Sequence, residues 1–509
     1  MRALNRRQQA KARRAAVWEA SGTRLAMNFT VADAKALQAA VQGTVVLPTD
    51  PSYQDARQGF VPNFQDFPQI IVECAVVSDV VQALAFARRH NLWVVCRAGG
   101  HSTAGYSVNS GMVLDVGGLN DVYVDPGARR AVVGAGCTFG KLNAALDLYG
   151  LHVPGGGCSD VAVAGYAQGG GYGLTSLMFG MHSDNLEAAQ VVLADGALVR
   201  VDESTNSDLF WALCGGTGNN FGVVVQLTYR LTPLGELWGF SIGFDLDHAP
   251  AALDVVQRVY TGHQVPDTVG QEAFLVYVGS EPRYLVRGVC EGSREAGREV
   301  MEPLLSLPGN TVDIDKAGGY NELNTELLST LPDVPAVARS ISDSRFLERP
   351  LTEAEWAGVV DVYRRTPNNG NFIGFEAYGG RIADVPIDKT AYIHRTASFN
   401  AFSWVFWMDE SERGPAEAWL DELIELLAGL GNGEAYQNYP RRANTRFAEM
   451  YWGAAFPTLQ AVKHKYDRSN FFHYEQSITP PGKAHGATDA RLLVDTTAAI
   501  TRLVEPRRS

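Results

Sequence analysis

Hydrophobic and polar residues follow two different patterns along the chain, and the change between them comes near residue 235. Before it, short apolar runs predict buried strands at 70–74, 92–96, 111–116, 131–136, 189–194, 198–201 and 221–231. Helical spacing of apolar residues predicts helices at 78–89, with Ser78 as the N-cap, and at 138–149, ending at Gly150. Asp195-Gly196 predicts a two-residue hairpin turn between two of the strands.

Beyond Pro233 the pattern changes to long amphipathic helices separated by strands. We expect helices at 251–260, 293–305, 352–364 and 415–430, and strands at 274–278, 372–376 and 402–407. This combination predicts an α+β region in which helices cover one face of a mostly antiparallel sheet. From about residue 435 the chain is rich in aromatic residues and returns to loops and helices.

The composition supports a large folded core and argues against nucleic acid and membrane as binding partners. Of 509 residues, 46% are hydrophobic and 19% are charged, which excludes disorder of the whole chain. The net charge of -13 argues against nucleic acid, because phosphates repel an acidic protein. No apolar run approaches the ~20 residues of a membrane span, so no membrane partner is expected. The six cysteines lack C-x-x-C spacing, which favours buried thiols in a reducing compartment.

The N-terminus is basic, with six Arg or Lys residues before the first acid, Glu19. It lacks the apolar segment of a secretory signal, and we therefore expect a cytoplasmic protein. The basic segment is interpreted as a disordered arm, or as residues upstream of a true start at Met27. Twin-arginine export through Arg6-Arg7, and contact with nucleic acid or membrane, are the alternatives.

Several common catalytic motifs are absent from the sequence. The glycine groups at 134–140 and 216–222 each place the third glycine one residue too late for G-x-G-x-x-G. There is no phosphate-binding P-loop, no G-x-S-x-G nucleophile motif and no H-E-x-x-H zinc motif. We expect no metal site.

Two glycine-rich loops remain, and each carries one nucleophile. The first is R-A-G-G-H-S at 97–102, which follows an apolar strand and contains His101. The second, at 155–173, holds eight glycines and Cys158. Glycines allow close approach of the backbone, and successive N–H groups can bind an anion. Each feature alone has an ordinary structural explanation, but together they indicate a large flat ligand that carries a pyrophosphate.

Longer stretches extend this pattern over nearly the whole chain past residue 45. They are R-A-G-G-H-S-T-A-G-Y-S (97–107), G-G-G-C-S-D-V-A-V-A-G-Y-A-Q-G-G-G-Y-G (155–173), W-A-L-C-G-G-T-G-N-N-F-G-V-V (211–224), Y-Q-N-Y-P (436–440), Y-W-G (451–453) and V-K-H-K-Y-D (462–467). In these stretches and their order, the chain resembles the berberine-bridge-enzyme-like flavoproteins of the vanillyl-alcohol-oxidase superfamily. The resemblance implies a two-part FAD-binding domain of PCMH type, at 45–235 and 431–509. A substrate-binding domain at 236–430 would lie between these parts, with an arm and first helix at 1–44.

The resemblance further implies FAD held by two covalent bonds, from His101 to the 8α-methyl carbon and from Cys158 to C6. An imidazole and a thiolate are the nucleophiles that an electrophilic flavin ring would capture. The other cofactor-binding residues that it implies are Arg97, Ala98, Gly99, Gly100, Ser102, Gly157, Val161, Gly165, Gly169, Gly170, Gly171, Tyr172, Gly173, Gly222, Val223, Val224 and Asn438.

The family's catalytic base is a tyrosine of the Y-Q-N-Y-P motif, which makes Tyr439 and Tyr436 the candidates, with Tyr172 as a second active-site phenol. A phenol with a pKa of ~10 is a poor base at neutral pH, so nearby cations or a second phenol are expected to lower it. Tyr439 has an alternative role as a hydrogen-bond partner of the ribityl chain. Arg441 and Arg442 stand where an aspartate often follows in the family.

The implied activity is that of an oxidase. Hydride passes from a hydroxyl-bearing carbon of a carbohydrate or secondary metabolite to FAD, and molecular oxygen is reduced to hydrogen peroxide. Val161 occupies the position that governs oxygen access in relatives, and valine there is compatible with an oxidase. The alternatives are oxidative ring closure, a dehydrogenase with another electron acceptor, and a flavoprotein that only carries a ligand. Four aromatic residues are candidates for stacking on the substrate: Tyr378, Phe402, Trp404 and Trp407.

Overall fold

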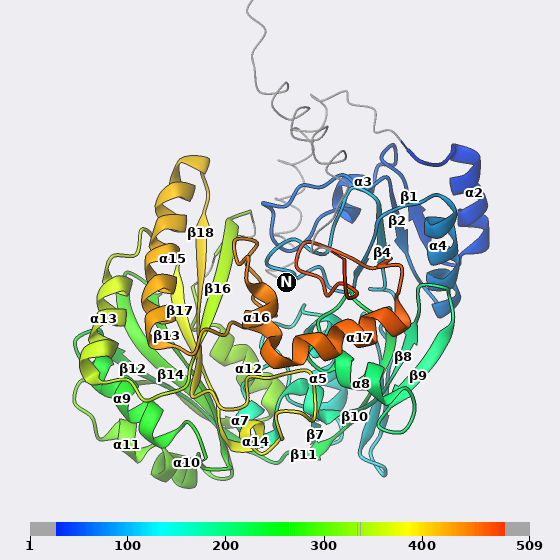
Figure 1. The fold of residues 1–509 in the computed structure, drawn as a ribbon. Helices are drawn as coiled ribbons and strands as arrows, with labels where there is room; N and C mark the ends of the chain where they lie inside the picture. The colour runs from blue at the N-terminus through cyan, green and yellow to red at the C-terminus, as the bar shows by residue number, and fades with distance from the viewer. Residues whose placement is uncertain (1–26, 264, 333, 336, 484–509) are drawn as a thin grey trace, which may run out of the picture.

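The computed structural model describes residues 27–483, except 264, 333 and 336. The predicted basic arm and the end of the predicted C-terminal segment lie outside the described residues. Sheets of four, five and seven strands organise the chain (Figure 1). We call the part with the first two sheets the first lobe and the part with the seven-stranded sheet the second lobe.

The first lobe opens with a four-stranded sheet in the order β1-β2-β4-β3, in which β2, β4 and β3 are parallel and β1 is antiparallel. The strands predicted at 70–74, 92–96 and 111–116 agree with it to within two residues. The elements are α2 (Val31–Ala40), β1 (Thr44–Val46), α3 (Tyr53–Ala56), β2 (Ile70–Glu73), α4 (Val77–Arg89), β3 (Val94–Arg97) and β4 (Met112–Asp115).

Helix α4 begins close to the predicted position, but Asp79 rather than Ser78 organises its first turn. The buried Asp79 carboxylate accepts hydrogen bonds from the backbone nitrogens of Gln42 (2.9 Å), Gly43 (3.0 Å) and Ala75 (2.9 Å). A carboxylate at a helix N-terminus is stabilised by such N–H donors and by the helix dipole. The same side chain therefore also fixes the chain that connects α2 to β1.

The second sheet of this lobe is antiparallel, in the order β5-β6-β10-β8-β9. Its strands are β5 (Val122–Asp125), β6 (Arg130–Gly134), β8 (Leu186–Val192), β9 (Leu198–Asp202) and β10 (Val223–Arg230). The other elements here are α5 (Phe139–Asp147), β7 (Leu151–His152), α6 (Val163–Gln168), α7 (Ser176–Phe179), η1 (His182–Asn185), α8 (Ser207–Leu213) and β11 (Thr232–Pro233), which pairs with β7.

Strands β8 and β9 form the predicted hairpin, but its turn has three residues rather than two. Leu193 donates its N–H to the Ala197 carbonyl (2.9 Å), and the N–H of Gly196 returns to the Leu193 carbonyl (2.9 Å). Gly196 has a φ of 93°, the left-handed conformation that a three-residue turn uses at its last position. The two-residue turn was therefore the wrong prediction.

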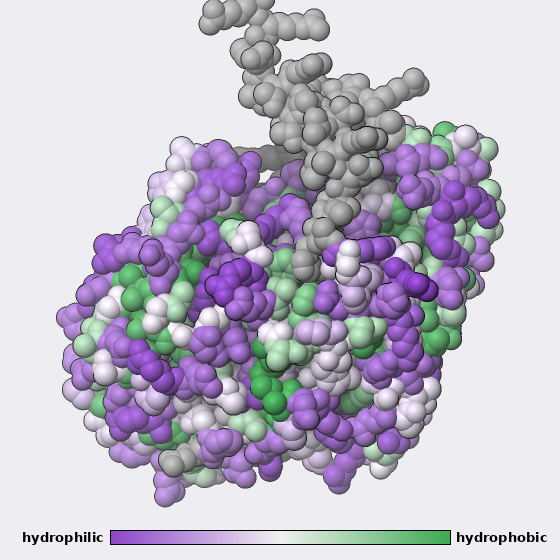
Figure 2. Space-filling view, viewed as in Figure 1, coloured by the Kyte–Doolittle hydropathy of each residue, from purple (hydrophilic) through white to green (hydrophobic). Residues whose placement is uncertain are grey.

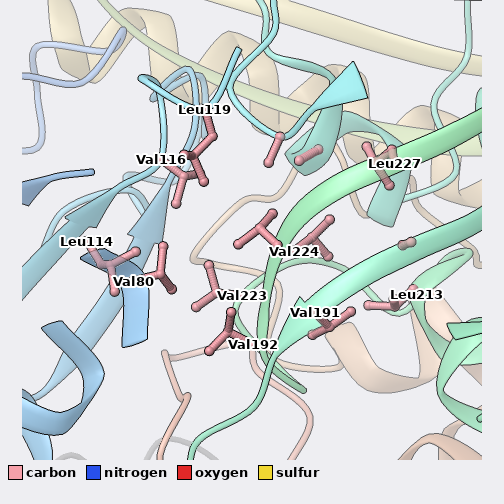
Figure 3. Close-up of a cluster of buried hydrophobic side chains, with 14 of the residues drawn as sticks. Val80, Leu114, Val116, Leu119, Val191, Val192, Leu213, Val223, Val224 and Leu227 are labelled. Carbon is pink, nitrogen blue, oxygen red and sulfur yellow. The ribbon is translucent and has the colours of Figure 1, made fainter. Parts of the chain in front are cut away.

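A hydrophobic core joins the two sheets of the first lobe (Figure 3). Val80 and Leu114 belong to α4 and β4, and they face Val192 and Val223 of β8 and β10. All four side chains are fully buried. Each contributes about 1.5–3 kcal/mol relative to an exposed position, so this packing holds the two sheets together.

The second lobe is built on a seven-stranded sheet in the order β15-β12-β14-β13-β17-β18-β16, and every neighbouring pair is antiparallel. This confirms the predicted α+β class. The strands are β12 (Leu237–Asp245), β13 (Val269–Val278), β14 (Glu281–Glu291), β15 (Thr311–Gly318), β16 (Arg339–Leu347), β17 (Phe372–Ala377) and β18 (Phe399–Trp407).

Helices α9 (Ala249–Val259), α13 (Glu353–Arg364) and α15 (Glu410–Leu430) cover the outer face of this sheet, whereas α12 (Tyr320–Leu328) lies toward the first lobe (Figure 1). The helix predicted at 293–305 is divided into α10 (Arg294–Val300) and α11 (Glu302–Leu305), with Pro303 in the first turn of α11. Helix α15 begins before the predicted 415, because Glu412 accepts the N–H groups of Met408 and Asp409 and so caps it. The short α14 (Gly380–Ala383) follows β17.

The C-terminal segment returns to the first lobe through α16 (Phe447–Trp452), η2 (Gly453–Ala455) and α17 (Phe456–Tyr466). Phe472 forms a parallel β-bridge with Val94 at the edge of the first sheet. The fully buried Lys463 ammonium donates to the Asp467 carboxylate (2.8 Å) and to the Phe472 carbonyl (2.6 Å). The segment after α17 therefore packs on the β3 edge of the first sheet.

The face shown in Figure 2 is mainly hydrophilic, with hydrophobic residues in small scattered groups. Within the described residues, no helix combines the length and the apolar character needed to cross a bilayer.

Candidate active site

A cavity of about 340 Å³ lies where the two lobes meet. The two glycine-rich loops form its wall on the first lobe, and strands β13, β14, β17 and β18 form its wall on the second. We call these the cofactor wall and the strand wall. The C-terminal segment 436–440 closes the cavity between them.

Most of the residues proposed from the sequence lie together around this cavity. They are Arg97, Ala98, Gly99, Gly100, His101, Ser102, Gly157, Cys158, Val161, Gly165, Tyr172, Gly173, Gly222, Val224, Tyr436, Asn438 and Tyr439. The tertiary structure thus brings segments that are more than 300 residues apart to one place.

Four of the proposed cofactor-binding residues do not line the cavity: Gly169, Gly170, Gly171 and Val223. The three glycines pack so closely on neighbouring side chains that a Cβ atom would collide with Asn438, Tyr392 and Tyr166, respectively. Val223 points into the core between the two sheets (Figure 3). Close packing of the second loop therefore requires glycine at these three positions.

His101 is held from two sides at the mouth of the cavity. The ring of Phe60 stacks on the imidazole with centroids 4.3 Å apart and planes 22° apart. At a ring nitrogen, Nε2 of His101 lies 3.5 Å from Oδ2 of Asp160. The imidazole therefore has a defined orientation before any ligand binds.

Cys158 opens onto the same cavity, but its surroundings favour the thiol rather than the expected thiolate. Cys158 is exposed on the cavity surface, but the protein atoms around the sulfur raise the pKa of the thiol, and the negative charge of Asp160 acts in the same direction. The cation of Arg287 opposes this shift. These surroundings favour the thiol over the thiolate.

The cofactor wall has the features that an FAD group requires. A Cβ atom at Gly165 would meet no atom within 4 Å, so this face of α6 is open toward the cavity. At Gly99 a Cβ atom would lie 2.9 Å from the backbone nitrogen of Ala162, so glycine is what lets the two loops touch. The buried Tyr106 hydroxyl lines the cavity without a hydrogen-bond partner. Together with the two nucleophilic side chains, His101 and Cys158, these residues fit a flavin nucleotide.

The phenol oxygen of Tyr436 accepts three N–H groups. The donors are the backbone nitrogens of Gly171 (3.0 Å) and Tyr172 (3.1 Å) and the side-chain amide of Asn438 (3.0 Å). Burial raises the Tyr436 pKa, and these three donors pull it down. The contacts also tie the C-terminal segment to the second glycine-rich loop.

Tyr439 donates its hydroxyl to the Glu376 carboxyl at 2.5 Å, and Asn400 donates to the other oxygen of Glu376 at 2.8 Å. Burial raises the Glu376 pKa to about 8, and the hydrogen bond from Tyr439 is the largest opposing effect. The Tyr439 pKa is also raised, by burial first and then by the charge of Glu376. The expected cation beside the base is therefore replaced by a carboxyl group, and Glu376 becomes the stronger candidate for a base near neutral pH.

The strand wall has a polar part and an aromatic part. In the polar part, Glu272 accepts two N–H groups from the buried Arg287 guanidinium, at 2.8 and 3.2 Å. The aromatic part consists of Phe274, Phe372, Phe402 and Trp404. This combination suits a ligand that presents hydroxyl groups on one side and an apolar face on the other.

Two of the four aromatic residues proposed to stack on the substrate do not reach the wall. Phe402 and Trp404 line it, but Trp407 packs into the core under the outer helices. Tyr378 is fully buried behind the wall, and its hydroxyl lies 2.6 Å from that of Tyr392.

Sequence reasoning did not identify Glu376, Glu272 or Arg287. For Glu376 a signal was present, because a glutamate ends the apolar strand at 372–376, and alternation places it on the face of Phe372. No local pattern pointed to Glu272 and Arg287, which meet only because β13 pairs with β14 in this register.

Two protein families match parts of the chain that line the cavity. Residues 68–202 match the FAD binding domain, and residues 435–479 match the family described as berberine and berberine like. The FAD-linked oxidoreductase YgaK of Bacillus subtilis is 28% identical, over 86% of this chain and 97% of its own length. The chain is an FAD-linked oxidoreductase that contains an FAD binding domain and a C-terminal segment similar to the berberine and berberine like family.

One further relative and two solved structures are similar to this chain over most of its length. Aclacinomycin-N/aclacinomycin-A oxidase of Streptomyces galilaeus is 26% identical over 85% of this chain and 89% of its own. The structure of BBE-like 1 from Physcomitrella patens has a TM-score of 0.81 at 25% identity and covers 89% of this chain and all of its own. A chitooligosaccharide oxidase shares the fold, with a TM-score of 0.79, 24% identity and the same coverage.

Proposed function

We propose that this oxidoreductase is an oxidase that takes hydride from a hydroxyl-bearing carbon of a carbohydrate or a glycosylated or polycyclic secondary metabolite. The observation that carries the proposal is the Tyr439–Glu376 pair, which lines the same cavity as His101 and Cys158. The relatives that act on an aclacinomycin and on a chitooligosaccharide support this class of substrate. Val161 on the cofactor wall is compatible with oxygen as the electron acceptor.

FAD, covalently held through His101 and Cys158, would supply the chemistry that accepts two electrons as hydride and passes them to oxygen, which gives hydrogen peroxide. The chain's own residues then have two tasks, which are to orient the substrate and to remove its hydroxyl proton.

The proton is removed by the Glu376 carboxylate, with the Tyr439 hydroxyl as the group that contacts the substrate. A base with a pKa near the working pH removes a proton most effectively, and the buried Glu376 meets this condition with its pKa of about 8. Tyr439 is hydrogen-bonded to it and lines the cavity, so it can pass the proton on.

Orientation comes from the rest of the strand wall. The free oxygen of the Glu272 carboxylate accepts hydrogen bonds from substrate hydroxyl groups, because Arg287 occupies only the other oxygen. Phe402 and Trp404 cover the apolar face of a sugar or polycyclic ring and keep water from the reacting carbon.

The test is a panel of mono- and oligosaccharides and hydroxylated polycyclic glycosides, mixed anaerobically with the purified holoenzyme. A substrate is expected to bleach the flavin absorbance, and air is expected to restore it with one equivalent of hydrogen peroxide. Bleaching without peroxide in air would indicate a dehydrogenase. If no hydroxylated compound bleaches the flavin, the proposed class of reaction is wrong.

A further inference from the structure

Asp160 has no part in the chemistry proposed so far, although it lies beside both side chains assigned to flavin attachment. It follows Cys158 by two residues, and its Oδ2 lies 3.5 Å from Nε2 of His101. One carboxylate therefore lies 3.5 Å from the imidazole of the first glycine-rich loop, and its negative charge also acts on the thiol of the second loop.

The backbone around Asp160 is fixed by hydrogen bonds to the start of α5. The N–H of Gly140 donates to the Ser159 carbonyl (2.9 Å), and the N–H of Phe139 donates to the Val161 carbonyl (3.0 Å). The N–H of Val161 closes the turn on the Cys158 carbonyl at 3.3 Å. The backbone on both sides of Asp160 is thus fixed by the fold, and the half-exposed carboxylate extends from it toward His101.

The carboxylate acts on the two nucleophiles in opposite directions. Facing Nε2 of His101, it favours the tautomer with the proton on Nε2, which leaves a lone pair on Nδ1 as the nucleophile. The same negative charge raises the pKa of the Cys158 thiol and so disfavours the reactive thiolate. The imidazole is therefore prepared for bond formation while the thiol is held back.

We propose that Asp160 is a positioning residue for flavin attachment, which holds the Nε2 proton of His101 and makes the His101 bond form before the Cys158 bond. This inference rests on the proposed bicovalent FAD. Each bond forms with loss of two protons and two electrons, one proton coming from the nucleophile and one from the flavin carbon. Oxygen takes up both electrons and two protons and leaves as hydrogen peroxide. Asp160 is the first acceptor of the proton that leaves Nε2.

The experiment follows each bond separately in the full-length protein. Protein from riboflavin-starved cells is mixed with FAD in air, and samples are denatured at intervals. Flavin fluorescence in a denaturing gel and the masses of the peptides that contain His101 and Cys158 report the two bonds. The variants are Asp160→Asn, Asp160→Glu and, as a matched control in the same turn, Ser159→Ala.

In D160N the His101 bond is expected to form about tenfold more slowly, or slower still, because the charge that orients the imidazole is lost. The Cys158 bond is expected to form at the wild-type rate or faster. D160E should restore the His101 bond, and S159A should behave like the wild type.

Equal slowing of both bonds in D160N would mean that Asp160 only maintains the local fold, and the proposed role would be wrong. A wild-type rate for the His101 bond in D160N would overturn it as well. If the wild-type protein forms no bond at either residue, the failure lies in the proposed bicovalent FAD, and the inference falls with it.

Discussion

The two walls of the active-site cavity are built in different ways. The cofactor wall is made mainly of backbone from two continuous loops, with His101 and Cys158 as its reactive side chains. The strand wall is made of side chains from four antiparallel strands, such as Glu376 of β17 and Trp404 of β18. A backbone wall requires glycines at particular positions, whereas a side-chain wall can change residue by residue without altering the sheet. The comparison shows how one fold can keep its cofactor while its substrates differ.

The largest effect is expected from a variant that impairs the reaction but not the binding of the cofactor. Glu376→Gln removes the proposed base but preserves the shape of the side chain. We expect kcat/KM to fall by about 10²–10⁴-fold, the usual contribution of a positioned base, with unchanged FAD content. Steady-state peroxide assays and flavin absorbance measure the two quantities. An E376Q enzyme with normal turnover would remove Glu376 from the mechanism.

The pH dependence of the same residue sharpens this prediction. Burial raises the Glu376 pKa to about 8, so turnover should rise with pH through that value. The hydrogen bond from Tyr439 lowers this pKa, so Tyr439→Phe should move the inflection to higher pH.

The same residue makes the stability of the protein depend on pH. The folded protein binds the Glu376 proton more tightly than the unfolded chain does, so the free energy of unfolding falls as the pH rises from the ordinary pKa of a glutamate toward 8. At pH 8, E376Q should therefore have a higher melting temperature than the wild type. Equal melting temperatures at this pH would show that burial does not destabilise the Glu376 carboxylate.

A smaller effect is expected from filling the cofactor wall. Gly165→Val places a side chain where the cavity is open. Overpacking typically costs about 1–3 kcal/mol, so FAD should bind roughly 5–150-fold more weakly. Gly358→Val is the matched control. Gly358 is also a helical glycine with no atom near its Cβ position, but it lies in α13, on the outer face of the seven-stranded sheet. Equilibrium titration of FAD before covalent attachment distinguishes the two variants, and equal affinities would show that Gly165 does not face the cofactor.

The smallest expected effect concerns the aromatic part of the strand wall. Trp404→Ala removes a ring that lines the cavity, and an aromatic contact is worth about 0.5–1.5 kcal/mol. KM should therefore rise about two- to twelvefold, with little change in kcat. Phe406→Ala tests the same face of β18 outside the cavity and should leave KM unchanged. If the two variants give the same KM, Trp404 does not contact the substrate.

The sequence alone determined the cofactor wall, because its information is local. Glycines that permit close backbone contact and a nucleophile beside them occupy short continuous segments, so 97–102 and 155–173 could be recognised without a fold. Short apolar runs likewise predicted many strands of the first lobe and three of the second, and helical spacing predicted the helices over the outer face of the second lobe. Which glycines face the cavity was not readable from the pattern, since Gly165 opens onto it while Gly169, Gly170 and Gly171 pack against side chains from distant segments.

Only the tertiary structure decided the strand wall. Glu272 meets Arg287 because β13 and β14 pair in one register, and a shift by a single residue would turn the side chains to the other face. Glu376 meets Tyr439 because the segment that leads from α15 back to the first lobe passes β17, and the two residues are 63 positions apart in the chain. The raised pKa of Glu376 depends on burial, which cannot be read from any single stretch of the sequence. The sequence thus determined which groups the chain carries, and the packing of its two lobes decided which of them act together.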